Sequence, residues 1–135
     1  MKKAAAAKWL KQAFHDLEMA ERNISIEGYD VAAFLSHQAV EKLLKALFVH
    51  QDRRIPKTHF IDELALSLDL SEEVLFHIFE LTADYTLARY PDVSDAVPYE
   101  QYDKSMALEK VAAAKKVFEL LQDRYDDLKE GSIGE

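Results

Sequence analysis

The sequence predicts an all-α fold, an up-and-down bundle of four or five helices. Three observations lead to this prediction. The chain of 135 residues has room for one hydrophobic core and one domain. Apolar residues recur at intervals of three and four along most of the chain, and no stretch alternates with a period of two. Only three glycines and three prolines are available for turns, which is few for a β fold with many hairpins.

Two long helices are predicted in the first part of the chain. Residues 3–25 carry one apolar stripe, and Gly28 follows it as a residue that readily ends a helix. Residues 29–51 are apolar over more than one face. A helix of this kind is usually central, or packs on one side against a second subunit. Pro56 ends this part of the chain, because it disfavours helical geometry in the residue before it.

The later helices are shorter or follow a break, and they are expected over residues 58–68, 71–90 and 103–128. Thr58 is a plausible cap for the first of these helices. Ser71 is a plausible cap for the second, which must stop at or before Tyr90 because Pro91 follows. Residues 90–102 contain two prolines and three tyrosines and are expected to form a loop.

Composition excludes several kinds of protein. No repeat or linker divides the chain, so we expect one domain over residues 1–130 and a flexible tail over residues 131–135. The absence of cysteine excludes disulfides, thiolate zinc sites and a cysteine nucleophile. The five histidines lack the spacing of a metal site, and we expect no metal or cofactor. No apolar run reaches the roughly 18 residues of a membrane span. Lysines interrupt the alanine-rich start, which favours a cytoplasmic protein without a signal peptide.

Charge is distributed unevenly along the chain. The net charge of −8 disfavours long-range attraction of nucleic acid, so the charge balance does not support RNA binding. Residues 42–59 nevertheless contain five basic residues and one acidic residue, whereas residues 60–100 contain ten acidic residues and Arg89 as their one basic residue. The basic segment can bind phosphate locally, or it is an ordinary exposed loop.

The second predicted helix carries a polar stripe formed by Gln38, Glu41, Lys42 and Lys45. Their spacing places all four on one face. Glu41 precedes Lys45 by four residues, the favourable order for an ion pair. Asp16, at the apolar edge of the first helix, can pair with one of the two lysines. The stripe is either a solvated face or the lining of a groove in which the lysines receive an anion.

The segment Arg89-Tyr90-Pro91-Asp92 is the most distinctive tetrapeptide. Its arginine stands at the end of an acidic helix, where the helix dipole favours a positive charge, and this is a sufficient structural reason for it. The functional alternative is that the planar guanidinium grips a phosphate or carboxylate in two places. Tyr90 would then stack on the ligand or donate its hydroxyl.

Residues 6–126 together resemble a HEPN domain. The resemblance is carried by several short blocks: Ala7-Lys8-Trp9-Leu10, Tyr29-Asp30-Val31-Ala32-Ala33-Phe34, Gln38-Ala39-Val40-Glu41-Lys42-Leu43-Leu44-Lys45-Ala46-Leu47, Pro56-Lys57-Thr58-His59, Arg89-Tyr90-Pro91-Asp92 and Pro98-Tyr99. It implies a helical bundle that is commonly dimeric. Such proteins are often encoded beside a minimal nucleotidyltransferase, as two-component or toxin–antitoxin-like pairs. The family name refers to proposed nucleotide binding.

Some proteins of this family are metal-independent ribonucleases, in which an arginine and a histidine four to six residues later form the active site at the dimer groove. Arg89 matches that arginine by position. No histidine follows it, since residues 93–96 contain none and His77 is the last histidine of the chain. An acid–base mechanism of RNA cleavage would therefore lack its expected proton carrier. Asp92 and Asp95 would also add negative charge where a phosphate must lie.

These considerations favour a non-catalytic binding module, homodimeric, that holds a nucleotide-like ligand and acts with a minimal nucleotidyltransferase. The alternatives are a ribonuclease toxin and a purely structural partner of another chain. In the binding module Arg89 would hold phosphate, Tyr90 would stack or form a hydrogen bond, and the two lysines would line the groove. Gln38 and Glu41 would orient those side chains. The candidate ligand-binding residues are Gln38, Glu41, Lys42, Lys45, Arg89, Tyr90 and Asp92.

Overall fold

The computed structural model describes the backbone of residues 2–134 and the side chains of residues 3–129. Within these residues all regular structure is helical, so the all-α prediction is confirmed. In chain order the helices are α1 (Lys2–Ser25), α2 (Tyr29–His50), α3 (Ile61–Leu66), α4 (Glu72–Leu81), α5 (Asp84–Leu87), α6 (Pro98–Gln101), α7 (Lys104–Leu120) and α8 (Gln122–Gly134). Nowhere in residues 2–134 does a helix combine the length and apolar character needed to cross a membrane.

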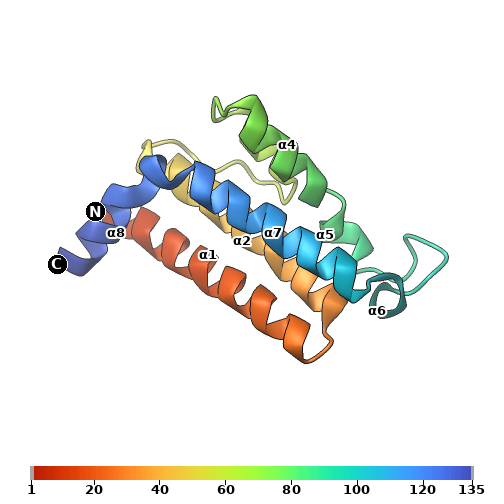
Figure 1. Cartoon of the computed structure of the whole chain (residues 1–135). Helices are drawn as coiled ribbons and strands as arrows, with labels where there is room; N and C mark the ends of the chain where they lie inside the picture. Colours follow the sequence, from red (N-terminus) through yellow and green to blue (C-terminus); the bar gives the residue numbers. More distant parts are fainter. Residues whose placement is uncertain (1, 135) are drawn as a thin grey trace.

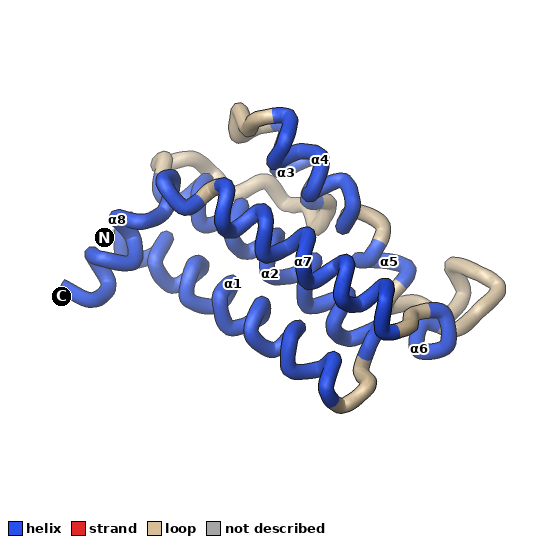
Figure 2. Tube along the Cα trace, in the orientation of Figure 1, coloured by secondary structure: helices blue, strands red, loops and turns tan. Residues whose placement is uncertain are grey.

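The long helices α1, α2 and α7 lie side by side and form the body of the bundle (Figure 1). Helix α4 packs on α7 as an outer layer, and α8 returns to pack on α1. The short helices α5 and α6 lie at the end of the bundle away from both termini (Figure 1). The two long loops, before α3 and before α6, connect the body to these outer elements (Figure 2).

Helix α2 is the centre of the core, as its wide apolar surface predicts. Leu43, Leu44 and Leu47 are at most 1% exposed and belong to the main apolar cluster with residues of α1, α4 and α7. Ala32 and Ala33, near its N-terminal end, contribute to two smaller clusters. Since so much of α2 is buried, the few polar side chains on it are held in a dense and rigid setting.

Four predicted element boundaries are wrong. The expected helix over residues 71–90 breaks at Thr82 and resumes as α5, and the expected helix over residues 103–128 breaks at Leu121 between α7 and α8. The expected loop contains α6, which begins at Pro98, a residue favoured in a first helical turn. Residues 58–60 are not helical, because the Thr58 hydroxyl accepts the amide hydrogen of residue 60 and closes a turn before α3.

The end of the chain also differs from the expected tail. The α8 backbone continues through Gly134 and so includes most of the predicted tail, residues 131–135, while Glu135 lies outside the described residues. The flexibility expected of this tail stays a prediction.

The break between α4 and α5 has a clear physical cause. Asp84 is 1% exposed, and its carboxylate accepts a hydrogen bond from the Tyr102 hydroxyl at 2.5 Å and forms an ion pair with Lys110 at 3.0 Å. Burial raises the pKa of Asp84, and its two partners counteract this. The helix breaks after α4, and with this break the Asp84 carboxylate reaches Lys110 on α7 and Tyr102, the residue after α6. The interaction fixes α5, and with it the segment that carries Arg89.

Replacing Tyr102 by phenylalanine is expected to lower the free energy of unfolding by about 1–3 kcal/mol, because Asp84 loses a hydrogen-bond donor inside the protein. Urea unfolding followed by circular dichroism measures this loss. The matched control is Tyr99→Phe, since Tyr99 is 71% exposed and should change stability little. Equal stabilities of the two variants would contradict the anchoring role of the Tyr102 hydroxyl.

Candidate functional site

Glu41 lies at the centre of the polar stripe on α2. Its side chain is only 5% exposed. One carboxylate oxygen, Oε2, accepts a hydrogen bond from Lys45 Nζ at 2.8 Å and lies 3.0 Å from His59 Nδ1. The other oxygen, Oε1, lies 3.9 Å from His37 Nδ1 and has no hydrogen-bond partner among the described residues. The predicted Glu41–Lys45 pair is therefore present, but it is buried, so this part of the stripe is not a solvated face.

Lys42 turns away from this cluster toward α1. It forms an ion pair with Asp16, as the sequence indicated for one of the two lysines, and Gln12 donates a second hydrogen bond to Asp16 at 2.9 Å. Next to this pair, residues of α1 together with Lys42 line an open hollow of about 330 Å³. Trp9 lines the hollow, and the Lys45 ammonium lies 5.9 Å from the centre of the indole ring. The stripe therefore ends in a hollow that combines an aromatic ring with amines.

Arg89 is exposed but held in place by aromatic rings. Its guanidinium carbon lies 5.6 Å from the ring centre of Phe34, 5.4 Å from that of Tyr85 and 5.3 Å from that of Tyr90. Its Nη1 also donates a hydrogen bond to the Tyr85 hydroxyl at 3.0 Å. Each such contact of a cation with a ring face is favourable. The guanidinium is therefore positioned in advance, and its remaining N–H groups are free of any carboxylate among the described side chains.

His59 connects the Glu41 cluster to Arg89 through Tyr85, a link that the sequence did not predict. Its imidazole stacks on the Tyr85 ring, with the ring centres 5.0 Å apart and the planes inclined by 10°, and its side chain is 58% exposed. Tyr85 therefore contacts both residues: its ring stacks on His59, and its hydroxyl accepts the hydrogen bond from Arg89. No histidine follows Arg89 in the sequence, but His59, from the loop before α3, contacts the same tyrosine as Arg89. The sequence signal for this histidine is the block Pro56-Lys57-Thr58-His59, which lies upstream of Arg89.

The structure does not bring all of the remaining predicted site residues, Gln38, Tyr90 and Asp92, into contact with Arg89 or Glu41. Gln38 is half-buried, and its Oε1 lies 3.2 Å from His37 Nδ1, so it orients a buried histidine and not a lysine. Tyr90 is 40% exposed beside Arg89 and is accessible for stacking. Asp92 is exposed in the turn that follows, and it makes no hydrogen bond or ion pair with the described residues. The structure does not join Asp92 to the cluster around Tyr85.

His37 is completely buried below this surface, and burial lowers its pKa below the ordinary value of 6.5. The nearby Glu41 carboxylate opposes this shift only in part. Nε2 of His37 has no hydrogen-bond partner among the described residues, so protonation there would place an N–H donor and a charge that Glu41 compensates only in part in the core.

The free energy of unfolding is therefore expected to fall as the pH falls through about 6.5. In that range His37 binds a proton in the unfolded chain, whereas in the folded protein it stays neutral until the pH reaches its lowered pKa. Each pH unit below about 6.5, down to the lowered pKa, costs up to about 1.4 kcal/mol. Urea unfolding between about pH 7.5 and 5.5 measures the slope. His37→Gln should flatten it, whereas His15→Gln, at an exposed position, should leave it unchanged. An unaltered slope in His37→Gln would contradict this assignment.

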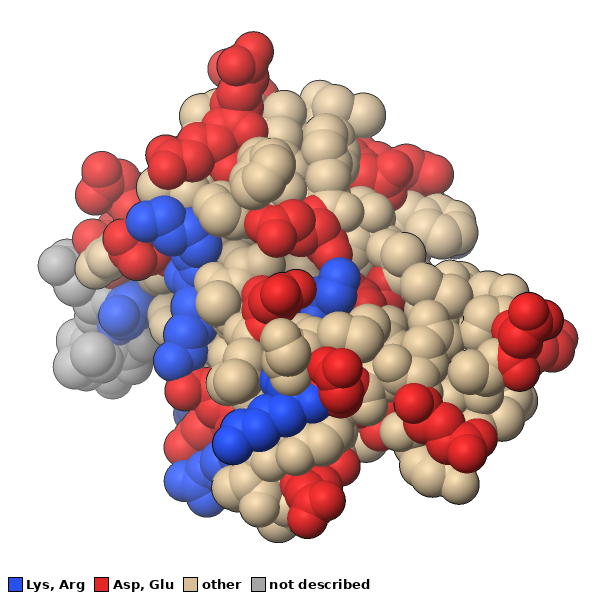
Figure 3. Space-filling model, turned by 45° about the vertical axis from the view of Figure 1, so that its right-hand side comes forward, with Lys and Arg blue, Asp and Glu red and all other residues tan. Residues whose placement is uncertain are grey.

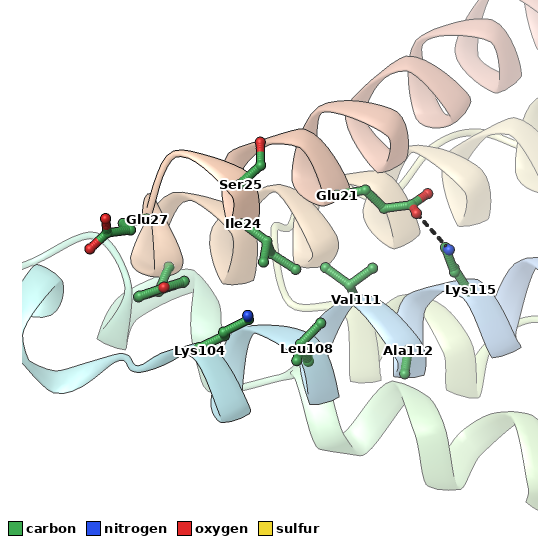
Figure 4. A pocket seen from close by; sticks show the side chains of 10 residues that line it. Glu21, Ile24, Ser25, Glu27, Lys104, Leu108, Val111, Ala112 and Lys115 are labelled. Carbon is green, nitrogen blue, oxygen red and sulfur yellow. Dashed lines mark ion pairs between the residues drawn. The ribbon is translucent and has the colours of Figure 1, made fainter.

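A larger hollow, of about 680 Å³, lies elsewhere, between the end of α1, the start of α2 and α7 (Figure 4). Ile24, Leu108 and Val111 form its apolar part, and Lys115 pairs with Glu21 at 2.6 Å across it. None of the residues predicted from sequence lines it. Its two lysines and two glutamates balance, so it offers no net attraction for an anion. On the face shown in Figure 3, acidic side chains form several separate groups, and basic side chains gather in a few narrow ones.

The side chains of residues 3–129 include no group of three or more histidines, aspartates and glutamates that could hold a metal ion. The groups that the structure brings together at the site are a guanidinium, an imidazole, a buried carboxylate with its ammonium, and aromatic rings. Such a set binds anions and ring-bearing ligands.

Comparison with protein families matches the model of the HEPN domain to residues 6–125. The chain belongs to the HEPN family. The match covers the helices that carry the candidate site, from Trp9 on α1 to Arg89 after α5. A comparison with curated proteins finds no match.

Solved structures similar to this HEPN domain share its fold over most of their length. TT1696 from Thermus thermophilus is 28% identical with a TM-score of 0.83, and the match covers 90% of this chain and 98% of that protein. ST0689, an archaeal HEPN homologue, is 32% identical with a TM-score of 0.75, covering 91% and 97%. A HEPN domain protein from Thermotoga maritima is 24% identical with a TM-score of 0.68, covering 86% and 95%, and it supports the fold alone.

Proposed function

We propose that this HEPN domain is a binding module for a phosphate-bearing, nucleotide-like ligand, with the phosphate at Arg89. The single observation that carries the proposal is the placement of Arg89. An exposed guanidinium is held against three aromatic rings and is paired with no carboxylate among the described residues. A guanidinium fixed in this way binds an anion with little loss of conformational freedom.

Neighbouring side chains extend the site beyond the phosphate. Tyr90 offers an exposed ring on which a base can stack, and stacking of this kind tolerates any base. Lys45 is neutralised by Glu41, so it supports the site through the position of its partner and not as a free cation. Lys42 is likewise paired with Asp16. The role proposed from sequence for the two lysines is accordingly indirect, and Arg89 is the principal anion contact.

Isothermal titration calorimetry with ATP, GTP and the corresponding monophosphates tests this proposal. Binding with one site per chain and a preference for nucleotides over nucleosides is the expected result, since the phosphate supplies the charged contact. An equal heat for adenosine and ATP, or no heat for any nucleotide, would contradict it.

We further propose that the module is a homodimer that acts with a minimal nucleotidyltransferase, in a two-component or toxin–antitoxin-like system. Membership of the HEPN family supports this. The outer face of α4 supports a second copy, because Phe76 and Phe79 are 63% and 50% exposed on it. Light scattering on the pure protein measures the mass of the assembly, and Phe76→Ser with Phe79→Ser is expected to halve it. Co-expression with a nucleotidyltransferase encoded beside it tests the second partner.

A metal-independent ribonuclease is the second candidate function, and the position of His59 favours it. The imidazole is exposed, held by Glu41, and stacked on the same tyrosine that contacts Arg89. A proton carrier is therefore available after all, although from a different part of the chain. Incubation with RNA in the presence of a chelator is the test. Cleavage that is lost in both Arg89→Ala and His59→Ala would establish the enzyme, and intact RNA would leave the binding module.

A further inference from the structure

We propose that His59 is the second anion contact of the Arg89 site, and that binding of an anion there takes up one proton from solution. This inference rests on the proposed function, since it assumes that Arg89 holds an anion. The inference adds two features to the proposed site: a contact from His59, which is remote from Arg89 in the sequence, and a dependence of anion binding on pH.

The geometry fixes which nitrogen of His59 is available to a ligand. Nδ1 lies 3.0 Å from Oε2 of Glu41, a carboxylate that is 5% exposed. The ring stacks almost parallel to Tyr85 at 5.0 Å, so it cannot turn freely. Because Nδ1 contacts Glu41, the other ring nitrogen, Nε2, does not face that carboxylate, and 58% of the side chain is exposed. Tyr85 also accepts the hydrogen bond from Arg89, so the guanidinium and the imidazole border the same aromatic side chain.

The carboxylate at Nδ1 decides what Nε2 can do. A carboxylate oxygen only accepts hydrogen bonds, so Nδ1 must carry the hydrogen. In the neutral imidazole Nε2 is then a bare acceptor, which repels a phosphate or sulfate oxygen. In the protonated imidazole Nε2 carries a hydrogen and donates to that oxygen. Only the charged form of His59 is therefore complementary to an anion held at Arg89.

The other charges around the His59 ring determine how readily it takes up a proton when an anion binds. On α2, Glu41 faces His59, but its charge is shared with Lys45, and the buried His37 lies close to the same carboxylate. Asp62 lies in the first turn of α3, and Arg89 adds a positive charge from the segment after α5. An anion placed between Arg89 and His59 supplies the negative charge that this group lacks. Its binding should therefore favour the charged imidazole, and by reciprocity protonation should favour its binding.

Sulfate is the appropriate probe, because it stays doubly charged across the range in which histidine titrates, so any pH dependence arises from the protein. In nuclear magnetic resonance titrations, sulfate is expected to move the midpoint of the His59 imidazole resonance to higher pH. His15 and His77, elsewhere on α1 and α4, serve as internal controls. The dissociation constant for sulfate, at constant ionic strength set with chloride, should rise about tenfold between pH 6 and pH 8.

His59→Gln should bind sulfate weakly and equally at both pH values, close to the wild-type affinity at the higher pH. Two other results separate the two proposals. If sulfate binding depends on Arg89 but is the same at both pH values or in His59→Gln, this inference is wrong and the proposed function stands. If Arg89→Gln also leaves sulfate binding unchanged, the anion does not bind at this site and both proposals are wrong.

Discussion

Arg89→Gln is expected to lower the affinity of the protein for ATP by about a hundredfold. The guanidinium can donate two charge-assisted hydrogen bonds to one phosphate, and each is worth roughly 1.5 kcal/mol or more. Glutamine is close in shape but removes the charge and the second donor. Because Arg89 is exposed and its bonds within the protein are those to aromatic rings and the Tyr85 hydroxyl, the stability should change by less than about 1 kcal/mol.

Calorimetric titration of both proteins with ATP measures this effect, and urea unfolding confirms that the variant is folded. Arg89→Lys keeps the charge but loses the planar fork, so its affinity should be intermediate. Arg54→Gln is the matched control, because Arg54 is exposed in the basic loop before α3. If Arg54→Gln weakened ATP binding more than Arg89→Gln, the ligand would be held by the loop and not by the site.

Glu41→Ala is expected to lower the free energy of unfolding by about 3–5 kcal/mol, because it leaves Lys45 buried without its partner. The Lys45 side chain is only 11% exposed, and Glu41 is its ion-pair partner in the structure. The same change removes the carboxylate that contacts Nδ1 of His59. Stacking on Tyr85 is then the main restraint on the imidazole ring. Ligand binding should weaken even at temperatures where the variant stays folded.

Two further variants distinguish a buried ion pair from ordinary packing. Glu18→Ala removes the partner of Arg22 in an exposed pair of the same i, i+4 spacing on α1, and it should cost less than about 1 kcal/mol. Adding Lys45→Met to Glu41→Ala should restore much of the lost stability, since no charge is then left unpaired. If the double variant were less stable than Glu41→Ala, the loss would be due to packing and not to the uncompensated charge.

Local patterns in the sequence were sufficient to predict the parts of the site that depend on one helix. Glu41 and Lys45 are four residues apart, and their pairing follows from helix geometry alone. The pairing of Lys42 with Asp16 required only that α1 and α2 pack against each other. The central position of α2 followed from the width of its apolar surface. In each case the interaction is set by periodicity, which the sequence displays directly.

The parts that the sequence did not reveal depend on contacts between distant segments. His59 reaches Glu41 across 18 positions through an irregular loop, whose course no periodic pattern describes. The break after α4 is caused by Asp84, which bonds to Tyr102 and Lys110 farther along the chain. Apolar periodicity continues across that break, so a single helix was the natural prediction. Both differences come from buried polar groups that must find partners wherever the fold provides them.

The most direct test of the account is to map the surface that a nucleotide contacts in solution, by recording amide and aromatic chemical shifts of the protein during titration with ATP. We expect the largest changes at Tyr85, Arg89, Tyr90 and His59, around the aromatic side chains that hold the guanidinium. Changes that instead gather at Ile24, Leu108 and Lys115, in the larger hollow between α1 and α7, would show that the ligand occupies a different site and would contradict the central role given to Arg89.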